Sequence, residues 1–374
     1  MMTDASKATP KSATPRPPVA AKRPTTTTHH GIDLTDDYAW LRDPGYPEVT
    51  DAEVLAHLEA ENAWFEARMA PQQDTIEALF KEMRARIKED DSSVPQKDGD
   101  WYYWVEYEKG AQYKQWWRKP AAGGRDGTEG KQLLLDEVAL AEGKDYFNLG
   151  SFSVSADGTK LSYSTDTDGS ERFEARIKDL ATGELLPDTI PGTLGSLIWT
   201  ANDSKIAYSL ANEQWRTDNV RLHTLGTPID QDVEIFHEDD EGFRCGASLS
   251  ANEQWLLIAT SDHETSEVRI VPAADPTAEQ LLIKARQKGV EYEVDVRGDT
   301  IVVLTNDDHV NFRLASAPLA NPGEWTTLIA GSDEFYITGF ELFEKFYVVE
   351  GRRAGLDQIE IRDYADPAKI TPVD

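Results

Sequence analysis

A short pattern recurs along most of the chain and constrains the fold more than any other feature. Each copy has a small or polar turn, a Gly- or amide-containing loop, and then a run of apolar residues typical of a β-strand. The clearest copies are residues 155–163, 200–208 and 250–258, which begin 45 and 50 residues apart, with looser copies at residues 297–303 and 343–349. A period of about 40–50 residues made only of short strands is the signature of β-propeller blades.

The pattern therefore predicts a mainly β fold, a β-propeller. A four-stranded blade cannot bury both faces alone, so consecutive blades must stack around an axis. We expect the strands of the first blade at residues 101–107, 113–119, 133–135 and 147–153. Later blades are expected to end near residues 200, 250, 297 and 338. A sixth blade begins at Gly339 and is expected to stop short of its last strand at Asp374, which makes about five and a half blades.

Composition divides the chain into three parts. Residues 1–30 are rich in Pro, Thr, Ala and Lys and are predicted to be a disordered tail, with an amphipathic transit peptide as the alternative. Residues 31–93 are predicted to be a helical segment, and residues 94–374 the incomplete propeller.

Two helices with apolar stripes are predicted in the second part. Thr50 with Glu53, and Asp74 with Glu77, have the spacing of capping boxes. Apolar residues then recur at helical spacing, at Val54, Leu58, Phe65 and Met69 and again at Ile76, Leu79, Phe80, Met83 and Ile87. A propeller closes on itself, so we expect the partner of these stripes to lie outside this chain.

Charge and cysteine content exclude several classes. The net charge is −30, which argues against nucleic-acid binding because phosphate contacts need clustered Lys and Arg. No apolar run reaches the length of a membrane span, and no secretory signal is visible. Cys245 is the single cysteine, expected to be a buried thiol, so an intrachain disulfide is impossible and a cytoplasmic location is compatible.

Motifs that carry chemistry are missing, and we predict no catalytic, cofactor-binding or metal-binding residue. There is no Gly-x-Ser-x-Gly nucleophile turn, and residues 246–250 lack the second glycine. Zinc, phosphate-loop and dinucleotide motifs are also absent. The histidines most open to a catalytic interpretation are expected to be structural: His57, His223, His237, His263 and His309.

Two acidic segments were compared with binding motifs. Residues 166–171 superficially suggest a calcium loop, but the glycine comes fourth and no glutamate closes a 12-residue loop, so a turn between strands is favoured. Residues 237–241 are acidic enough to bind a cationic peptide, but an exposed, solvated loop is the default expectation.

A resemblance adds what spacing cannot. The segments 36–43 and 58–62 resemble the N-terminal signature of the prolyl oligopeptidase family of serine peptidases, and its oligopeptidase B branch most of all. Further segments agree in order along the chain, at residues 146–150, 155–158, 168–171, 223–227, 265–268, 291–292, 305–306, 311–312 and 351–356.

The resemblance implies a seven-bladed propeller that caps an α/β-hydrolase domain and admits short, basic peptides for cleavage after Arg or Lys. It implies that the family's Ser, Asp and His all lie in the hydrolase domain, which is absent here together with the seventh blade. No catalytic residue is therefore carried over, and no cofactor is implied. The expected partners are the hydrolase domain, which the N-terminal helices would contact, and basic oligopeptides. Blade loops around Glu171 are candidates for interdomain contact.

Two functions remain open from the sequence. One is the substrate-gating propeller of an oligopeptidase B-like peptidase, inactive alone. The other is a stand-alone, non-enzymatic propeller that binds a protein or peptide. An unfinished array would expose strand edges and apolar faces, which disfavours the second.

Overall fold

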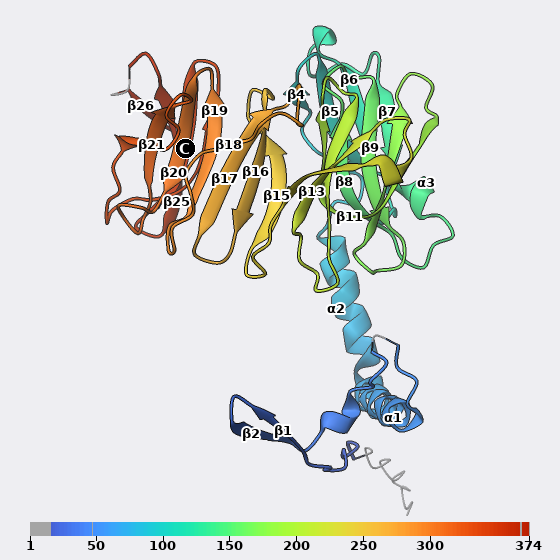
Figure 1. Ribbon diagram of the computed structural model, residues 1–374. Helices are drawn as coiled ribbons and strands as arrows, with labels where there is room; N and C mark the ends of the chain where they lie inside the picture. Colours follow the sequence, from blue (N-terminus) through green and yellow to red (C-terminus); the bar gives the residue numbers. More distant parts are fainter. Residues whose placement is uncertain (1–15, 47, 367–368, 374) are drawn as a thin grey trace, which may run out of the picture. The chain divides into compact units, whose positions relative to one another are not determined.

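The computed structural model describes residues 16–46, 48–366 and 369–373, and its contacts divide the chain into two units, Met1–Glu89 and Asp90–Asp374 (Figure 1). The division falls a few residues before the predicted boundary at residue 93. In the described residues, no helix is both long and apolar enough to cross a membrane.

The first unit begins with a β-hairpin that the sequence analysis did not predict. Strands β1 (Thr25–His29) and β2 (Ile32–Asp36) pair antiparallel across a turn at His30 and Gly31, whose φ angles are 53° and 79°. Two consecutive positive φ angles are typical of the tight turns that match strand twist, and threonines favour extended backbone. The prediction of a disordered tail over residues 1–30 is therefore wrong for this strand, and residues 1–15 lie outside the described residues.

Helices α1 (Ala52–Met69) and α2 (Gln73–Ala85) follow, as predicted, but with different caps. The Asp51 carboxylate accepts hydrogen bonds from the backbone N–H groups of Glu53 and Val54, so Asp51 caps α1 where Thr50 was expected. Helix α2 begins after Gln72 with no side-chain cap, because the turn Ala70–Gln72 leads directly into it.

The apolar stripes of both helices are largely exposed. Val54 is the buried residue of α1. The exposed large apolar side chains of the two helices and the residues just after them include Leu58, Phe65, Ile76, Leu79, Phe80, Met83 and Ile87. A helix that presents such a stripe to water gains little from tertiary packing. The stripes are therefore exposed surfaces, and the expectation that their partner lies outside this chain stays a prediction.

The second unit is a series of antiparallel sheets (Figure 1). The first blade contains β3 (Asp91–Ser92), β4 (Gln96–Asp98), β5 (Trp101–Tyr107), β6 (Gln115–Pro120) and β7 (Gln132–Asp136). The short helix α3 (Glu137–Ala141) follows. Blades two and three share one seven-stranded sheet of β8 (Asn148–Val154), β9 (Lys160–Asp166), β10 (Phe173–Asp179), β11 (Leu185–Thr200), β12 (Lys205–Leu210), β13 (Asn219–Thr224) and β14 (Val233–His237).

The last three blades are separate four-stranded sheets. Blade four contains β15 (Arg244–Leu249), β16 (Trp255–Ser261), β17 (Ser266–Pro272) and β18 (Leu281–Leu282). Blade five contains β19 (Tyr292–Arg297), β20 (Thr300–Thr305), β21 (Arg313–Pro318) and β22 (Thr326–Ile329). Blade six contains β23 (Tyr336–Leu342), β24 (Phe346–Arg353), β25 (Leu356–Asp363) and β26 (Ile370–Val373).

The mainly β class with two preceding helices is confirmed, but the blades are assigned differently. Strand β8 opens the second blade, whereas the sequence analysis placed it last in the first. A repeat fixes the period of an array but not the strand at which each unit begins. The sixth blade was also expected to lack its last strand, but β26 pairs with β25, so the sixth blade has four strands and the described residues form six blades.

Strand β11 spans two blades because it bends. Its first half pairs with β10 and its second half with β12. Gly192 and Gly195, with φ of 72° and 78°, lie between the halves, where a register shift occurs. Glycine adopts such angles without a steric penalty. The bend turns the outermost strand of blade two into the innermost strand of blade three.

The core is divided among the contacts between consecutive blades. Five apolar clusters are buried in the described residues, and each joins one blade to the next. For example, Ile177 and Ile190 of blade two pack with Leu197 and Ile206 of blade three. Stability is therefore distributed along the array, as expected for a repeat architecture.

The repeated turn itself is held by side-chain hydrogen bonds. In blade two the Asp157 carboxylate accepts hydrogen bonds from the Ser155 hydroxyl and from the backbone N–H and hydroxyl of Thr159. Burial alone would raise the pKa of Asp157, but these hydrogen bonds and the Lys160 charge outweigh it and lower the pKa to about 2. The carboxylate thus stabilises the fold when ionised.

Asp157→Asn is expected to lower the free energy of unfolding by about 1 kcal/mol at neutral pH, less than the full pKa shift implies because solvent screens this exposed group. The folded pKa is depressed, so this contribution is present above the ordinary value of 3.8 and is lost as the pH falls toward about 2. Urea unfolding from pH 7 to pH 2 measures it. Asp299→Asn, in the corresponding turn of blade five, is the matched control. A constant difference between wild type and Asp157→Asn across this range would contradict the assignment.

Candidate functional site

The two ends of the blades carry different loops. We name the four strand positions of each blade A to D in chain order, with β3 and β4, which both pair with β5, together at position A of blade one. A–B turns lie at one end, the AB end, and B–C loops at the other, the BC end. Strand β3 pairs with the last residues of β5, Tyr107 and Glu106, so the chain enters blade one at the BC end. Strand β26 runs from Ile370, opposite Arg362, toward Val373, opposite Ile359, and so also points to the BC end.

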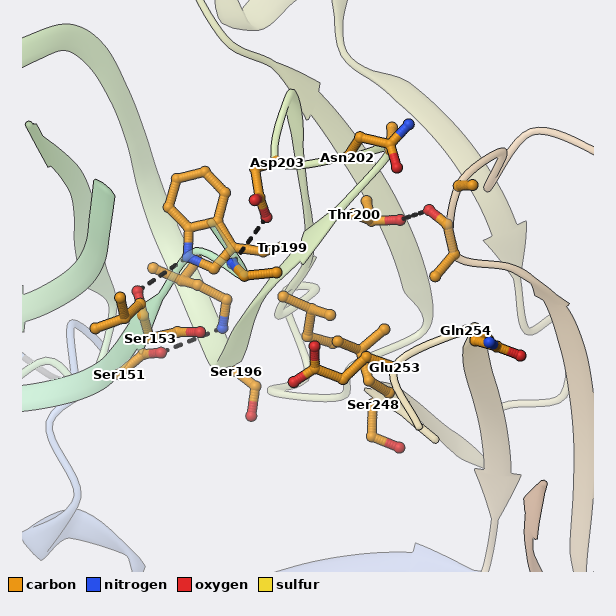
Figure 2. Close-up of a pocket in the computed structure, with 18 of the residues that line it drawn as sticks. Ser151, Ser153, Ser196, Trp199, Thr200, Asn202, Asp203, Ser248, Glu253 and Gln254 are labelled. Carbon is orange, nitrogen blue, oxygen red and sulfur yellow. Dashed lines mark hydrogen bonds between the residues drawn. The ribbon is translucent and has the colours of Figure 1, made fainter. Parts of the chain in front are cut away.

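A cavity of about 560 Å³ lies between the inner strands of blades two, three and four. Figure 2 shows Ser151 and Ser153 on one side of this cavity and Ser248 and Glu253 on the other. The indole N–H of Trp199 donates to the carbonyl oxygen of Ser153 at 2.9 Å, which joins blades two and three along the wall. Apolar residues such as Phe152, Val154 and Ile198 also line the cavity, so the lining is mixed and small hydroxyl groups are part of its polar share.

Carboxylates gather at the AB end of this cavity. Glu253 lines it and also lines a second cavity of about 410 Å³ that Asp98 of blade one enters. Burial raises the pKa of Glu253, and the charges of Asp98 and Asp203 raise it further. Asp203 itself accepts hydrogen bonds from the backbone N–H groups of Ala156 and Asp157. This mouth is thus a region of negative potential that attracts cations at long range.

Two adjoining cavities lie at the BC end, where loops of blades two, three and four meet. One, of about 460 Å³, is lined by Glu171, Trp215 and Arg244 together with residues of β11 and β15. The other, of about 680 Å³, is lined by Glu241, Asp262 and His263. Arg244 and residues of neighbouring loops also line this second cavity, so the Arg244 side chain is common to both.

The blade-two loop of this site is organised by one buried carboxylate. Asp166 accepts hydrogen bonds from the backbone N–H groups of Asp168, Gly169 and Glu171, at 2.8–3.0 Å. These bonds hold Glu171 at φ 57°, a left-handed conformation. Residues 166–171 therefore form a turn that binds its own backbone. Within the described ranges, no group of three or more His, Cys, Asp or Glu side chains is placed to hold a metal ion.

The blade-three loop displays Trp215 in an unusual conformation. Its φ is 60°, which is rare and costly for a bulky residue, and its side chain is exposed. The Asn212 side chain accepts hydrogen bonds from the backbone N–H groups of Gln214 and Arg216, which fixes the loop. The Arg172 guanidinium lies 4.6 Å from the centre of the Trp215 ring. The loop backbone is thus held by hydrogen bonds, and the exposed Trp215 lines the cavity.

The third loop, residues 238–243, is fastened to its neighbours. Arg216 donates from Nη1 to the backbone carbonyls of Glu238, Asp240 and Phe243, at 2.8–3.3 Å. Glu238 is buried and paired with Arg286, whose Nη2 lies 2.5 Å from Glu238 Oε2. The expectation of a fully solvated loop at residues 237–241 is therefore wrong for Glu238, whereas Asp239 is exposed.

The other residues singled out by sequence lie in structural positions. Burial, followed by the charges of Asp218 and Glu238, raises the pKa of Cys245 to about 12, so its thiol stays protonated at neutral pH. His223 is buried between Asp188 and Asp232. Three further histidines lie within 4 Å of a carboxylate: His57, His237 and His309. Sequence reasoning missed Trp215 and Arg244, for which no local pattern gave a signal.

Comparison with known proteins identifies the architecture. A family model described as "Prolyl oligopeptidase, N-terminal beta-propeller domain" matches residues 17–371. Oligopeptidase B from Trypanosoma brucei, in a closed form with covalently bound antipain, superposes with a TM-score of 0.88 at 29% sequence identity, over 96% of this chain and 53% of that one. Oligopeptidase B from Leishmania major gives the same TM-score at 26% identity, with the same coverage of both chains.

Curated relatives agree. Dipeptidyl aminopeptidase BI of Pseudoxanthomonas mexicana is 36% identical over 96% of this chain and 51% of the relative, and Protease 2 of Moraxella lacunata is 31% identical over 91% of this chain and 49% of the relative. The class defined by the fold is a β-propeller joined to N-terminal helices. The chain belongs to the prolyl oligopeptidase family and matches its N-terminal propeller domain. It spans about half the length of the curated relatives it matches.

Proposed function

We propose that this chain is the substrate-gating propeller part of an oligopeptidase B-like serine peptidase that cleaves short peptides after Arg or Lys. The catalytic Ser, Asp and His would lie in an α/β-hydrolase domain of the same protein, and the chain alone would be inactive. The observation that carries the proposal is the match to the family's propeller domain over residues 17–371. Its relatives are named as peptidases.

The BC end is the face that we propose meets the hydrolase domain. Strand β3 of the first blade lies at this end, and β26 points toward it. The cavities lined by Glu171, Trp215 and Arg244 open among the BC loops. In this arrangement the propeller covers the catalytic site and excludes folded proteins and water.

Exposed apolar groups support a larger protein over a stand-alone propeller. Blade six exposes Leu356, Ile359, Ile370 and Val373. The stripe of α2 adds Leu79, Phe80 and Met83. Contiguous apolar patches on a soluble protein mark interaction surfaces or aggregation sites. A seventh blade and a hydrolase domain would cover them.

The preference for basic peptides rests on charge. The net charge of −30 and the carboxylates of Glu253, Asp98 and Asp203 create a field that increases the encounter rate of cationic peptides. This field acts on a peptide as it approaches the propeller, whereas the catalytic domain would select the bond that is cleaved.

Hydrolysis assays test the proposal. The native product, purified from its source cells, is expected to cleave fluorogenic peptides with Arg or Lys before the scissile bond at least about tenfold faster than matched peptides with Gln. The 374-residue chain is expected to cleave none of them. Hydrolysis by the chain alone would refute its proposed inactivity. Equal rates for the Arg and Gln peptides would refute the proposed preference for basic residues. An N-terminally acetylated substrate distinguishes an endopeptidase from a dipeptidyl aminopeptidase, the activity named for the relative at 36% identity.

A further inference from the structure

Arg244 differs from every other arginine in the described part of Asp90–Asp374. Those others make ion pairs, as Arg216, Arg286 and Arg313 do, or donate to backbone carbonyls, as Arg118 and Arg297 do. The remaining ones are Arg125, Arg172, Arg176, Arg221, Arg269, Arg352, Arg353 and Arg362, each with a hydrogen bond, ion pair or aromatic ring as partner.

Arg244 has no such partner among the residues that the structure describes, although the full chain is rich in acids, with 68 Asp and Glu residues against 38 Lys and Arg. It is exposed at the first position of β15, and its side chain lines both BC-end cavities. Glu241 and Asp262 line the 680 Å³ cavity with it but make no ion pair with it. An unpaired guanidinium in a cavity offers a planar, bidentate donor to a carboxylate.

The surroundings of Arg244 are rigid. The backbone N–H of the next residue, Cys245, donates to the Thr217 carbonyl at 2.8 Å, which fixes the start of β15 against the Trp215 loop. Arg216 holds that loop to residues 238–243, as described above. Because the backbone of both loops is held, the freedom lost when a ligand binds is largely that of the two side chains themselves.

We propose that Arg244 and Trp215 form a subsite that binds a carboxylate of a short peptide, either its C-terminal α-carboxylate or an acidic side chain. The inference deepens the proposed function, on which it rests, by specifying how the propeller would orient a substrate. The guanidinium would bind the carboxylate, and the indole would contact the adjoining side chain.

The negative charge of the chain explains why such a subsite would set the orientation in which a peptide binds. The field of the chain attracts the cationic part of a peptide and repels its carboxylate almost everywhere. In the described BC-end cavities, the unpaired guanidinium of Arg244 offsets this repulsion. A peptide therefore has one favourable orientation, with its carboxylate at Arg244.

Calorimetric binding to the 374-residue chain tests the inference, with three pentapeptides that share one Arg. One has a free C-terminal carboxylate, one a C-terminal amide, and one a C-terminal amide with an internal Glu. The acid is expected to bind about tenfold more tightly than the plain amide. General electrostatics predicts the opposite order, because the amide lacks the negative carboxylate and its net charge is one unit more positive.

Arg244→Gln is expected to abolish this preference or reverse it, and Arg244→Lys to retain part of it. Arg352→Gln, at an exposed ion pair of blade six, is the matched control and should keep the preference. Tight binding of the Glu-containing amide would assign the site to side-chain carboxylates as well. Absence of an acid preference in the wild type, or its persistence in Arg244→Gln, would overturn the inference. The readout needs no hydrolysis, so it can fail while the native product proves to be a peptidase, and the reverse.

Discussion

Replacing His223 with alanine is expected to lower the free energy of unfolding by about 3–5 kcal/mol. The imidazole lies between two carboxylates, with Nδ1 2.8 Å from Asp232 Oδ1 and Nε2 3.0 Å from Asp188 Oδ1. All three side chains are at most 2% exposed. Removing the ring leaves two buried carboxylates without their shared partner, which costs free energy.

The group also joins blades. Asp188 belongs to the part of β11 in blade two, whereas His223 lies in β13 of blade three. Tyr208 donates its hydroxyl to Asp232 at 2.7 Å and extends the network. Urea unfolding followed by tryptophan fluorescence measures the loss. His237→Ala is the control, because His237 is exposed and lies 3.6 Å or more from its carboxylates, and it should cost less than about 1 kcal/mol. Similar losses for both variants would refute the structural role.

Arg286→Ala is expected to cost about 3 kcal/mol, toward the lower limit for a broken buried pair because Arg286 is partly exposed. The Arg286 side chain pairs with Glu238 and also lies 3.7 Å from Glu267, Nε to Oε2, and both carboxylates are buried. Its guanidinium also lies 4.0 Å from the centre of the Phe243 ring. Loss of the side chain should therefore loosen residues 238–243 as well as lower stability.

Arg352→Ala provides the matched comparison, because the Arg352–Asp357 pair of 2.9 Å is exposed and is expected to contribute no more than about 1 kcal/mol. Hydrogen exchange should show faster exchange at the Phe243 amide in Arg286→Ala and no change there in Arg352→Ala. Unchanged exchange at Phe243 in Arg286→Ala would show that the loop does not depend on this arginine.

The fold was predictable where the information is local. The repeated turn contains its own hydrogen-bonding partners, Ser155, Asp157 and Thr159, so the sequence pattern and the structure coincide there. The strand at which each blade begins was not predictable, because a repeat does not mark which strand opens a unit. The hairpin β1–β2 was missed because its composition resembles that of a disordered tail, although the turn at His30 and Gly31 was a usable signal.

The candidate site depends on long-range contacts. Glu238 looks like a solvated acid until Arg286, far along the chain, is seen beside it. Arg244 is distinctive because no side chain among the described residues pairs with it, and this is visible only once its neighbours have been placed. Trp215 is exposed by a loop whose conformation no residue pattern predicts.

The mass of the native product, combined with serine-directed labelling, tests the central claim most directly. An antibody raised against the 374-residue chain would isolate the product from its source cells after treatment with a fluorophosphonate probe. The account predicts a labelled polypeptide of roughly twice the 41.8 kDa of this chain, in line with relatives of which it spans about half. An unlabelled native product of 41.8 kDa, with no labelled polypeptide bound to it, would contradict the account.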